Sequence, residues 1–180
     1  MDARRNWRNP MVKIKIYIEG GGKAKTWTAV DLFCKALEHQ KPEELPLLLV
    51  DSEEAFKDDT SVWQHLKLRD NWDKPAEASE QHAYLMVQVM ETWFLADIEA
   101  LRAYFGNNLK PDKIPAWTDL ESVRKKVVFE TLDRATAQCG EKRYAKGKIS
   151  FELLSSINPQ KVADKCPHGK RLLDFLFQKR

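Results

Sequence analysis

The sequence predicts an α/β fold, with a small, mainly parallel sheet flanked by helices and a helical C-terminal extension. Three apolar segments with strand patterns lie in the first half of the chain, and the patterns after Pro115 are helical. Strands early in a chain and helices late are typical of an α/β core with a helical cap.

Length and composition favour one globular unit. A chain of 180 residues can form one core with a helical extension, but hardly two independent domains. Hydrophobic residues make up 43% of the chain and charged residues 32%, which are ordinary globular values. We therefore expect a flexible tail over residues 1–10, an α/β core over residues 11–106, and a helical part over residues 107–180 that packs on the core.

The first predicted strand lies close to the start of the chain. Ile14, Ile16 and Ile18 alternate with lysine and tyrosine, which is the period of a strand with one buried and one wetter face. This strand leads directly into Glu19 and three consecutive glycines. Glycines allow a sharp turn and leave backbone amides open to a ligand.

A helix and a second strand follow the glycines. Apolar residues recur at helical spacing and predict an amphipathic helix from Thr28 to about Gln40, which Pro42 ends. Residues 45–50 are continuously apolar, as expected of a central strand buried on both faces. This second strand ends at Asp51.

The middle of the chain combines a polar excursion with a third strand. Residues 57–81 are polar and predict one short helix, with four apolar anchors: Trp63, Leu66, Leu68 and Trp72. Residues 83–90 are apolar enough for an interior strand. From Glu91 the period becomes helical, and it predicts one helix that ends near Gly106 and carries Asp97 close to its start.

Two sequence signals mark the starts of later helices. Thr118 and Glu121 have the spacing of a capping box, and they predict a helix that continues toward Gly140. Asn158 and Pro159 predict another helix start. The apolar stripe of a last helix consists of Leu172, Leu173, Leu176 and Phe177.

Charge, cysteine content and hydropathy exclude several classes of protein. The chain has 30 basic and 27 acidic side chains, so any nucleic-acid-binding surface must be local. Three cysteines lie far apart, which fits free thiols in a reducing compartment. No apolar run approaches the roughly 20 residues that span a bilayer, and no export signal is recognisable. We expect a cytoplasmic protein that does not enter the membrane.

Acidic side chains follow each of the three predicted strands. Glu19 follows the first, Asp51 and Glu53 follow the second, and Glu91 with Asp97 follows the third. The carboxyl ends of parallel strands meet at one edge of a sheet. Crowded carboxylates repel one another unless a cation neutralises them, and oxygen ligands suit Mg²⁺ or Mn²⁺. A metal ion there can polarise a phosphoryl oxygen, so the pattern predicts metal-dependent phosphodiester chemistry.

A structural interpretation of the same acidic residues stays open. Acidic residues after strands also cap helices and solvate loops. Glu53 fits such a corner as well as it fits a metal site, and Asp97 fits an exposed helix position. Glu19 has no helix to cap immediately and Asp51 ends the most buried strand, so a functional role is favoured for these two.

The last third of the chain contains a basic cluster that could contact phosphates. Its members are Tyr144, Lys146, Lys148, His168, Lys170 and Arg171, of which Lys146, Lys148, His168 and Arg171 are the candidate phosphate-binding residues. A solvated helical face is the structural alternative.

Four segments of the sequence carry a family resemblance: Ile16–Gly22, Leu47–Glu53, Leu85–Asp97 and Tyr144–Phe151. Together they resemble the bacterial family filed as domain of unknown function 4276, from about Met11 to the end of the chain. The resemblance implies a Toprim-like fold, in which a glutamate after the first strand is a general acid or base and a later acidic pair binds Mg²⁺.

The resemblance assigns roles to residues and implies a partner. Glu19 takes the role of the acid or base, and Asp51 with Glu53 takes the role of the metal-binding pair. The family resembles companions of ATPases in mobile-element and phage-defence loci, which implies a partner ATPase. Family members usually have an extra helix and strand before the helix that begins here near Thr28, so this chain has a shortened N-terminal core.

Three functions are therefore expected, in descending order of support. The first is a Toprim-like Mg²⁺-dependent nuclease or phosphodiesterase. The second is a catalytically inactive interaction subunit that docks on an ATPase through its helical C-terminal part. The third is an RNA-binding module that uses Lys146, Lys148 and Arg171.

Overall fold

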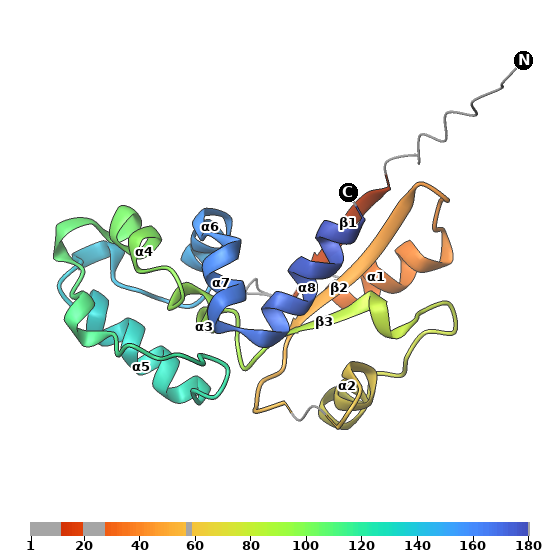
Figure 1. Cartoon of the computed structure of the whole chain (residues 1–180), viewed down its shortest axis with the longest axis horizontal. Coiled ribbons are helices and arrows are strands. Elements are labelled where there is room, and N and C mark those ends of the chain that lie inside the picture. Colours follow the sequence, from red (N-terminus) through yellow and green to blue (C-terminus); the bar gives the residue numbers. More distant parts are fainter. Residues whose placement is uncertain (1–11, 20–27, 57–58, 180) are drawn as a thin grey trace, which may run out of the picture.

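The computed structural model describes residues 12–19, 28–56 and 59–179, which form a parallel sheet and two groups of helices (Figure 1). The three strands are β1 (Lys13–Ile18), β2 (Glu44–Asp51) and β3 (Ala83–Met86). The helices before residue 110 are α1 (Ala29–Glu38), α2 (Val62–Asp70), α3 (Glu91–Phe94) and α4 (Ile98–Phe105). Those after residue 120 are α5 (Lys125–Thr136), α6 (Lys148–Ser156), α7 (Pro159–Lys165) and α8 (Pro167–Gln178).

The three strands form one sheet in the order β1-β2-β3, and both pairs are parallel. Ile18 lies opposite Leu49, and Asp51 lies opposite Met86, so the three strands end at the same edge. This arrangement confirms the predicted α/β class, with a small parallel sheet, flanking helices and helices at the C-terminal end of the chain.

The apolar run in β2 is buried on both faces because alternate side chains of a strand point to opposite sides. Leu48 and Val50 pack with α1 and α2, where Phe33 and Leu66 are fully buried. The opposite face of the sheet contributes side chains to a larger core, namely Leu47, Leu49, Tyr84 and Met86. This core continues through the helices from α3 to α8.

The last helix, α8, packs against α7 and also returns to the sheet (Figure 1). The ring of Phe175 on α8 lies 5.7 Å from the ring of Tyr84 on β3. Helices α4, α5 and α6 lie beyond the edge at which the strands end. This edge therefore faces a group of helices from the second half of the chain, and residues distant in the sequence can meet there.

Three predicted elements have different limits in the structure. Strand β3 ends at Met86, and the helix predicted to run to Gly106 is divided into α3 and α4. The division occurs because the Asp97 side chain accepts a hydrogen bond from the Ala100 amide and thereby begins a new helix. The helix expected from Thr118 begins only at Lys125.

The spacing of Thr118 and Glu121 has a different cause from the predicted capping box. The Glu121 carboxylate accepts hydrogen bonds from the backbone amides of His168 and Gly169, so it serves the N-terminus of α8, 47 residues away. Negative charge is stabilising at the N-terminus of a helix. Glu121 does cap the N-terminus of a helix, as predicted, but this helix is α8 and not the one that was expected to begin near Thr118.

The polar excursion contains the expected helix, α2, but one of its predicted anchors is wrong. Trp63 and Leu66 are buried, whereas Leu68 is 82% exposed because it lies on the opposite face of the helix. The predicted tail over residues 1–10 and the glycine turn after Glu19 lie outside the described residues.

Candidate active site at the carboxyl edge of the sheet

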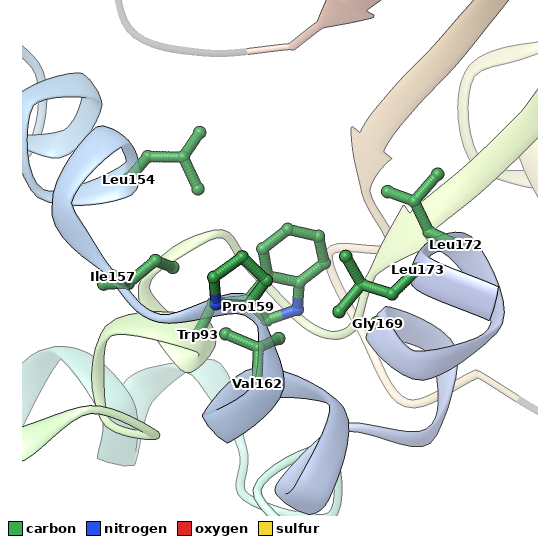
Figure 2. Close-up of a pocket in the computed structure, with 8 residues that line it drawn as sticks. All are labelled: Trp93, Leu154, Ile157, Pro159, Val162, Gly169, Leu172 and Leu173. Carbon is green, nitrogen blue, oxygen red and sulfur yellow. The ribbon is translucent and has the colours of Figure 1, made fainter. Parts of the chain in front are cut away.

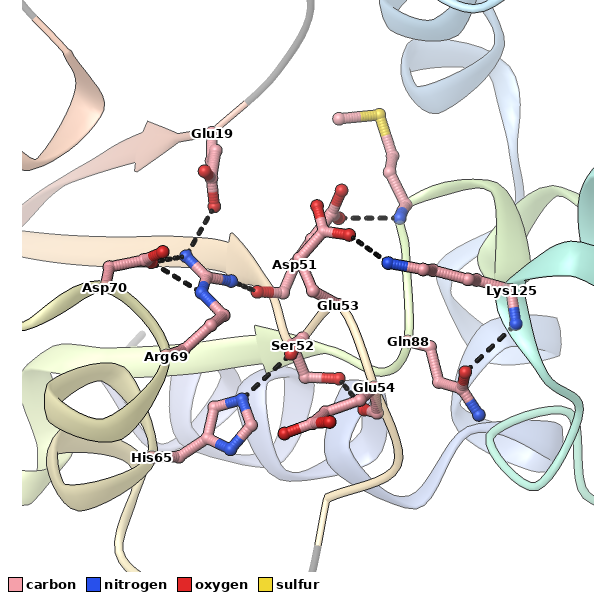
Figure 3. A network of polar contacts seen from close by, with 11 residues as sticks. Glu19, Asp51, Ser52, Glu53, Glu54, His65, Arg69, Asp70, Gln88 and Lys125 are labelled. Carbon is pink, nitrogen blue, oxygen red and sulfur yellow. Dashed lines mark hydrogen bonds and ion pairs between the residues drawn. The ribbon is translucent and has the colours of Figure 1, made fainter.

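Four carboxylates gather where the strands end, and Figure 3 shows three of them, those of Glu19, Asp51 and Glu53. Glu19 follows β1, Asp51 ends β2, Glu53 lies in the loop after it, and Glu91 begins α3. The charges of the other three all act on Asp51, so the structure brings together four of the five predicted acidic residues. The edge is also tied by a hydrogen bond from the Glu19 amide to the Leu49 carbonyl, 2.9 Å long.

Asp51 is the central and most perturbed member of the group. Its side chain is buried, and its Oδ1 accepts a hydrogen bond of 2.7 Å from the Met90 amide. Burial, together with the neighbouring charge of Glu91, raises the pKa of Asp51 to about 7. Such a carboxyl exists in both its protonated and its charged form near neutral pH.

Glu91 is buried almost completely, with 1% of its surface exposed. Its Oε1 accepts hydrogen bonds from the Tyr144 hydroxyl at 2.5 Å and the Ser150 hydroxyl at 3.3 Å. Its Oε2 has no hydrogen-bond partner among the described residues. A buried carboxylate oxygen without a partner is costly and calls for a ligand or a cation.

Glu19 is held by an arginine that sequence analysis did not single out. The Arg69 guanidinium, on α2, donates to Glu19 Oε2 at 3.2 Å and also to Asp70 and to the Asp51 carbonyl. Burial raises the pKa of Glu19, and the charge of Arg69 only partly opposes this effect. Glu19 can therefore hold a proton more readily than an ordinary glutamate.

Glu53 is paired with a lysine from the second half of the chain. Lys125 Nζ, at the start of α5, donates to Glu53 Oε2 at 2.8 Å. Burial acts to raise the pKa of Glu53, but the hydrogen bond and charge of Lys125 outweigh it, so the pKa is lowered. Glu53 has a backbone φ of 64°, a left-handed conformation that is uncommon for residues other than glycine.

Asp97, which was predicted among the metal ligands, has contacts of a structural kind in the described part of the chain. Its carboxylate caps α4, accepts a hydrogen bond of 2.9 Å from the Asn158 amide, and pairs with Lys161 at 2.8 Å. Burial opposes ionisation, but these interactions hold the pKa of Asp97 at about 2. Asp97 therefore joins α4 to α7 as a cap that is charged at neutral pH.

The four predicted basic residues do not behave as one cluster. The charge of Lys146 acts on Glu53, so this lysine is near the carboxylates, and it lies over the ring of Phe129. His168 pairs with Glu121, whereas the charge of Arg171 acts on Tyr84 of β3. The side chain of Lys148 lies outside the described part of the chain.

Sequence reasoning missed Arg69 and Lys125, which hold Glu19 and Glu53, and it placed Tyr144 in the basic cluster without connecting it to Glu91. Tyr144 also begins one of the four segments that carry the family resemblance. Arg69 and Lys125 lie in stretches whose polar composition is that of an ordinary solvated surface.

The family model described as domain of unknown function (DUF4276) matches residues 9–176. The chain belongs to the DUF4276 family. The matched range contains every residue of the carboxylate group, together with Arg69, Lys125 and Tyr144. No curated protein and no solved structure matches this DUF4276 chain. In the part of the chain that is described, none of the helices has the length and apolar character needed to span a bilayer.

The carboxylate edge of this DUF4276 protein has the oxygen donors that a hard cation prefers. Among the described residues, no three acidic, histidine or cysteine side chains already converge around a metal position. Two of the carboxylates, those of Glu19 and Glu53, instead face Arg69 and Lys125. Asp51 and the partnerless Oε2 of Glu91 are the two donors that fit a cation without competition from a basic side chain.

A separate pocket of about 120 Å³ lies among the helices and has a different character (Figure 2). Its walls are apolar and consist of Trp93, Leu154, Ile157, Pro159, Val162, Gly169, Leu172 and Leu173. Trp93 Nε1 is buried and has no hydrogen-bond partner among the described residues. None of these described lining residues has an ionisable side chain, so the pocket differs in character from the carboxylate edge.

Proposed function

We propose that this DUF4276 protein is a Toprim-like Mg²⁺-dependent nuclease or phosphodiesterase. The observation that carries the proposal is the buried pair of Asp51 and Glu91 at the carboxyl edge of a parallel sheet. Among the described residues, neither carboxylate forms an ion pair, and one oxygen of Glu91 has no partner at all. Two desolvated carboxylates of this kind are stabilised by a divalent cation.

Asp51 and Glu91 would hold the metal ion, and Glu53 is near enough to Asp51 to join them. When bound, Mg²⁺ supplies charge stabilisation to a phosphoryl oxygen and to a leaving alkoxide. Glu19 lies beside the pair and has a raised pKa, so it can hold or give up a proton at its carboxylate. This is the acid or base role that the family resemblance implies for it.

The cellular setting forms part of the same proposal and rests on the family resemblance. The protein would act in the cytoplasm, as a component of a mobile-element or phage-defence system, together with an ATPase. Nucleic acid is the substrate class, because its backbone offers both the phosphodiester bond and the negative charge that Lys146 and Lys125 would meet.

The first test is calorimetric titration of Mg²⁺ and Mn²⁺ into the wild-type protein and the Asp51→Asn variant. We expect binding by the wild type and a loss of at least about tenfold in affinity for the variant, because one of two uncompensated ligands is removed. Asp174→Asn, an exposed change on α8, is the matched control and should bind like the wild type. Equal binding by all three proteins would contradict the proposed site.

Metal binding must then be connected to activity. Single-stranded and double-stranded DNA and RNA should be cleaved only with Mg²⁺ or Mn²⁺, and Glu19→Gln should abolish cleavage while it leaves the thermal unfolding midpoint and metal affinity largely unchanged. Cleavage that survives in Glu19→Gln would remove this residue from the chemistry.

A catalytically inactive interaction subunit is the second candidate. It is favoured by the ion pairs of Arg69 and Lys125, which already neutralise Glu19 and Glu53 without a metal. The apolar pocket and the partly exposed ring of Phe151 on α6 supply a surface on the helical part for a partner protein. Asp51→Asn should then leave partner binding intact and no nuclease activity should be found. The dispersed basic residues give the RNA-binding alternative less support.

A further inference from the structure

Lys125 links the helical part to the carboxylate edge at two points (Figure 3). Its backbone amide donates to Gln88 Oε1 at 2.9 Å, which fixes the start of α5 beside the loop after β3. Its side chain then reaches Glu53 Oε2, 72 residues earlier in the chain. The backbone of Lys125 is therefore anchored, whereas its ammonium group pairs with one carboxylate, that of Glu53, among the described residues.

The carboxylate that Lys125 binds is also a candidate metal ligand. Glu53 lies two residues after Asp51, and its charge acts on the Asp51 carboxyl. While Lys125 holds Glu53, this carboxylate is neutralised by a lysine and competes poorly for a cation.

The two ion pairs at the edge differ in how easily they can exchange partners. Arg69 has three acceptors and only 10% of its side chain is exposed, so its position beside Glu19 is fixed. The Lys125 and Glu53 side chains are 46% and 40% exposed. Exposed ion pairs are weak, and a lysine on a flexible stem can move to another anion at low cost.

We propose that Lys125 is a built-in counter-cation that holds Glu53 in the metal-free protein and moves to a phosphate oxygen of a bound nucleic-acid strand, which releases Glu53 to the metal ion. This inference rests on the proposed function, because it needs both a metal and a phosphodiester substrate at this edge. Lys125 then acts as a positioning residue for Glu53 and as a contact for the substrate backbone. Binding of the strand and binding of the metal assist each other, and such coupling is reciprocal.

The first experiment compares Mg²⁺ affinity by calorimetry in the wild type, Lys125→Ala and Lys126→Ala. Removal of Lys125 frees Glu53, so we expect Mg²⁺ to bind about three- to fivefold more tightly. Lys126 is the matched control: it is the next residue on α5, is 86% exposed, and contacts only Glu130 at 3.9 Å among the described acidic residues. Its removal deletes the same charge and should change Mg²⁺ affinity less than twofold.

The second experiment measures the substrate contact without metal. A fluorescent 12-nucleotide single-stranded DNA is titrated with each protein in EDTA at several salt concentrations. Lys125→Ala should bind the DNA more weakly, with a salt dependence reduced by about 0.7 in slope, because one phosphate contact is lost. Lys126→Ala should keep the wild-type slope.

The combined outcomes separate this inference from the proposed function. The inference about Lys125 is supported if Lys125→Ala binds Mg²⁺ more tightly and DNA more weakly than the wild type. It is also supported if Lys125→Ala binds Mg²⁺ and the wild type does not. If Asp51→Asn abolishes Mg²⁺ binding but Lys125→Ala leaves it unchanged or weaker, the proposed function stands and the role of Lys125 is refuted. If no variant binds Mg²⁺, both are refuted. Lys125→Gln removes the charge but keeps most of the aliphatic side chain, so it should behave like Lys125→Ala. Thermal unfolding of each variant shows whether the substitution disturbs the fold.

Discussion

The hydrogen bond between Tyr144 and Glu91 makes a quantitative prediction about stability. Tyr144→Phe removes only the hydroxyl that donates to Glu91 Oε1, and it leaves Ser150, at 3.3 Å, as the remaining donor to that oxygen among the described residues. Both side chains are buried, so water cannot readily replace the lost donor. A hydrogen bond to a charged group contributes about 1.5–3 kcal/mol, so the free energy of unfolding should fall by about this amount.

The assay is urea unfolding monitored by circular dichroism, with Tyr104→Phe as the matched control. Tyr104 also donates to a glutamate, Glu152, at 2.5 Å, but this pair is exposed to water. Its loss should change the free energy of unfolding by little more than the experimental error. If Tyr144→Phe is no more destabilising than Tyr104→Phe, the argument that Glu91 is a buried charge dependent on Tyr144 is refuted.

Three further predictions follow from the perturbed carboxyls and from α2. Burial and the charge of Glu91 raise the pKa of Asp51 in the folded protein from 3.8 to about 7, so between these pH values the folded protein binds a proton that the unfolded chain has lost. The free energy of unfolding should therefore fall by up to about 4 kcal/mol as the pH rises from about 4 to about 7. Asp51→Asn should flatten this fall in unfolding curves measured across the range. The pKa of Asp97 is lowered to about 2, so its contribution to the free energy of unfolding is present above about pH 4 and is lost as the pH falls below it. In urea unfolding at pH 7, Asp97→Asn should destabilise the protein by about 1–3 kcal/mol. The same variant should keep the Mg²⁺ affinity of the wild type in calorimetry, and a loss of affinity would return Asp97 to the metal site. On α2, Leu66→Ala should cost about 2–5 kcal/mol of unfolding free energy, while Leu68→Ala should cost less than about 0.5 kcal/mol, and equal effects would contradict the orientation of this helix.

Those parts of the fold that depend on local patterns could be predicted from the sequence. The continuous apolar run of β2 predicted a strand buried on both faces, and the end of this run predicted that Asp51 lies at the edge of the sheet. Glu19 and Glu91 were found by the same reasoning, because each follows a predicted strand. Parallel pairing then brings these three residues together without any knowledge of the loops.

Features that depend on distant contacts could not be predicted in this way. The helical spacing of apolar residues continues across the break between α3 and α4, as seen in Phe94, Ile98, Leu101 and Phe105. The spacing therefore predicted one continuous helix, although Asp97 caps a second one. The partner of Glu121 lies 47 residues away, and its spacing from Thr118 imitated a local cap.

The cationic partners of the carboxylates were missed for the same reason. Arg69 lies 50 residues from Glu19, and Lys125 lies 72 residues from Glu53. Nothing in a single sequence distinguishes such residues from solvated arginines and lysines, since their role depends on the pairing of segments in space. Tyr144 differs only because it belongs to a segment that the family resemblance had already marked.

The return of α8 to the sheet has a consequence for how the chain is made. One face of the sheet, with Leu47 and Leu49, belongs to a core that is completed by Leu172 and Phe175, which leave the ribosome more than 120 residues later. Contacts of such high sequence separation slow folding, and the nascent chain carries an uncovered apolar surface in the meantime. This face of the sheet can be covered completely only after α8 has been synthesised.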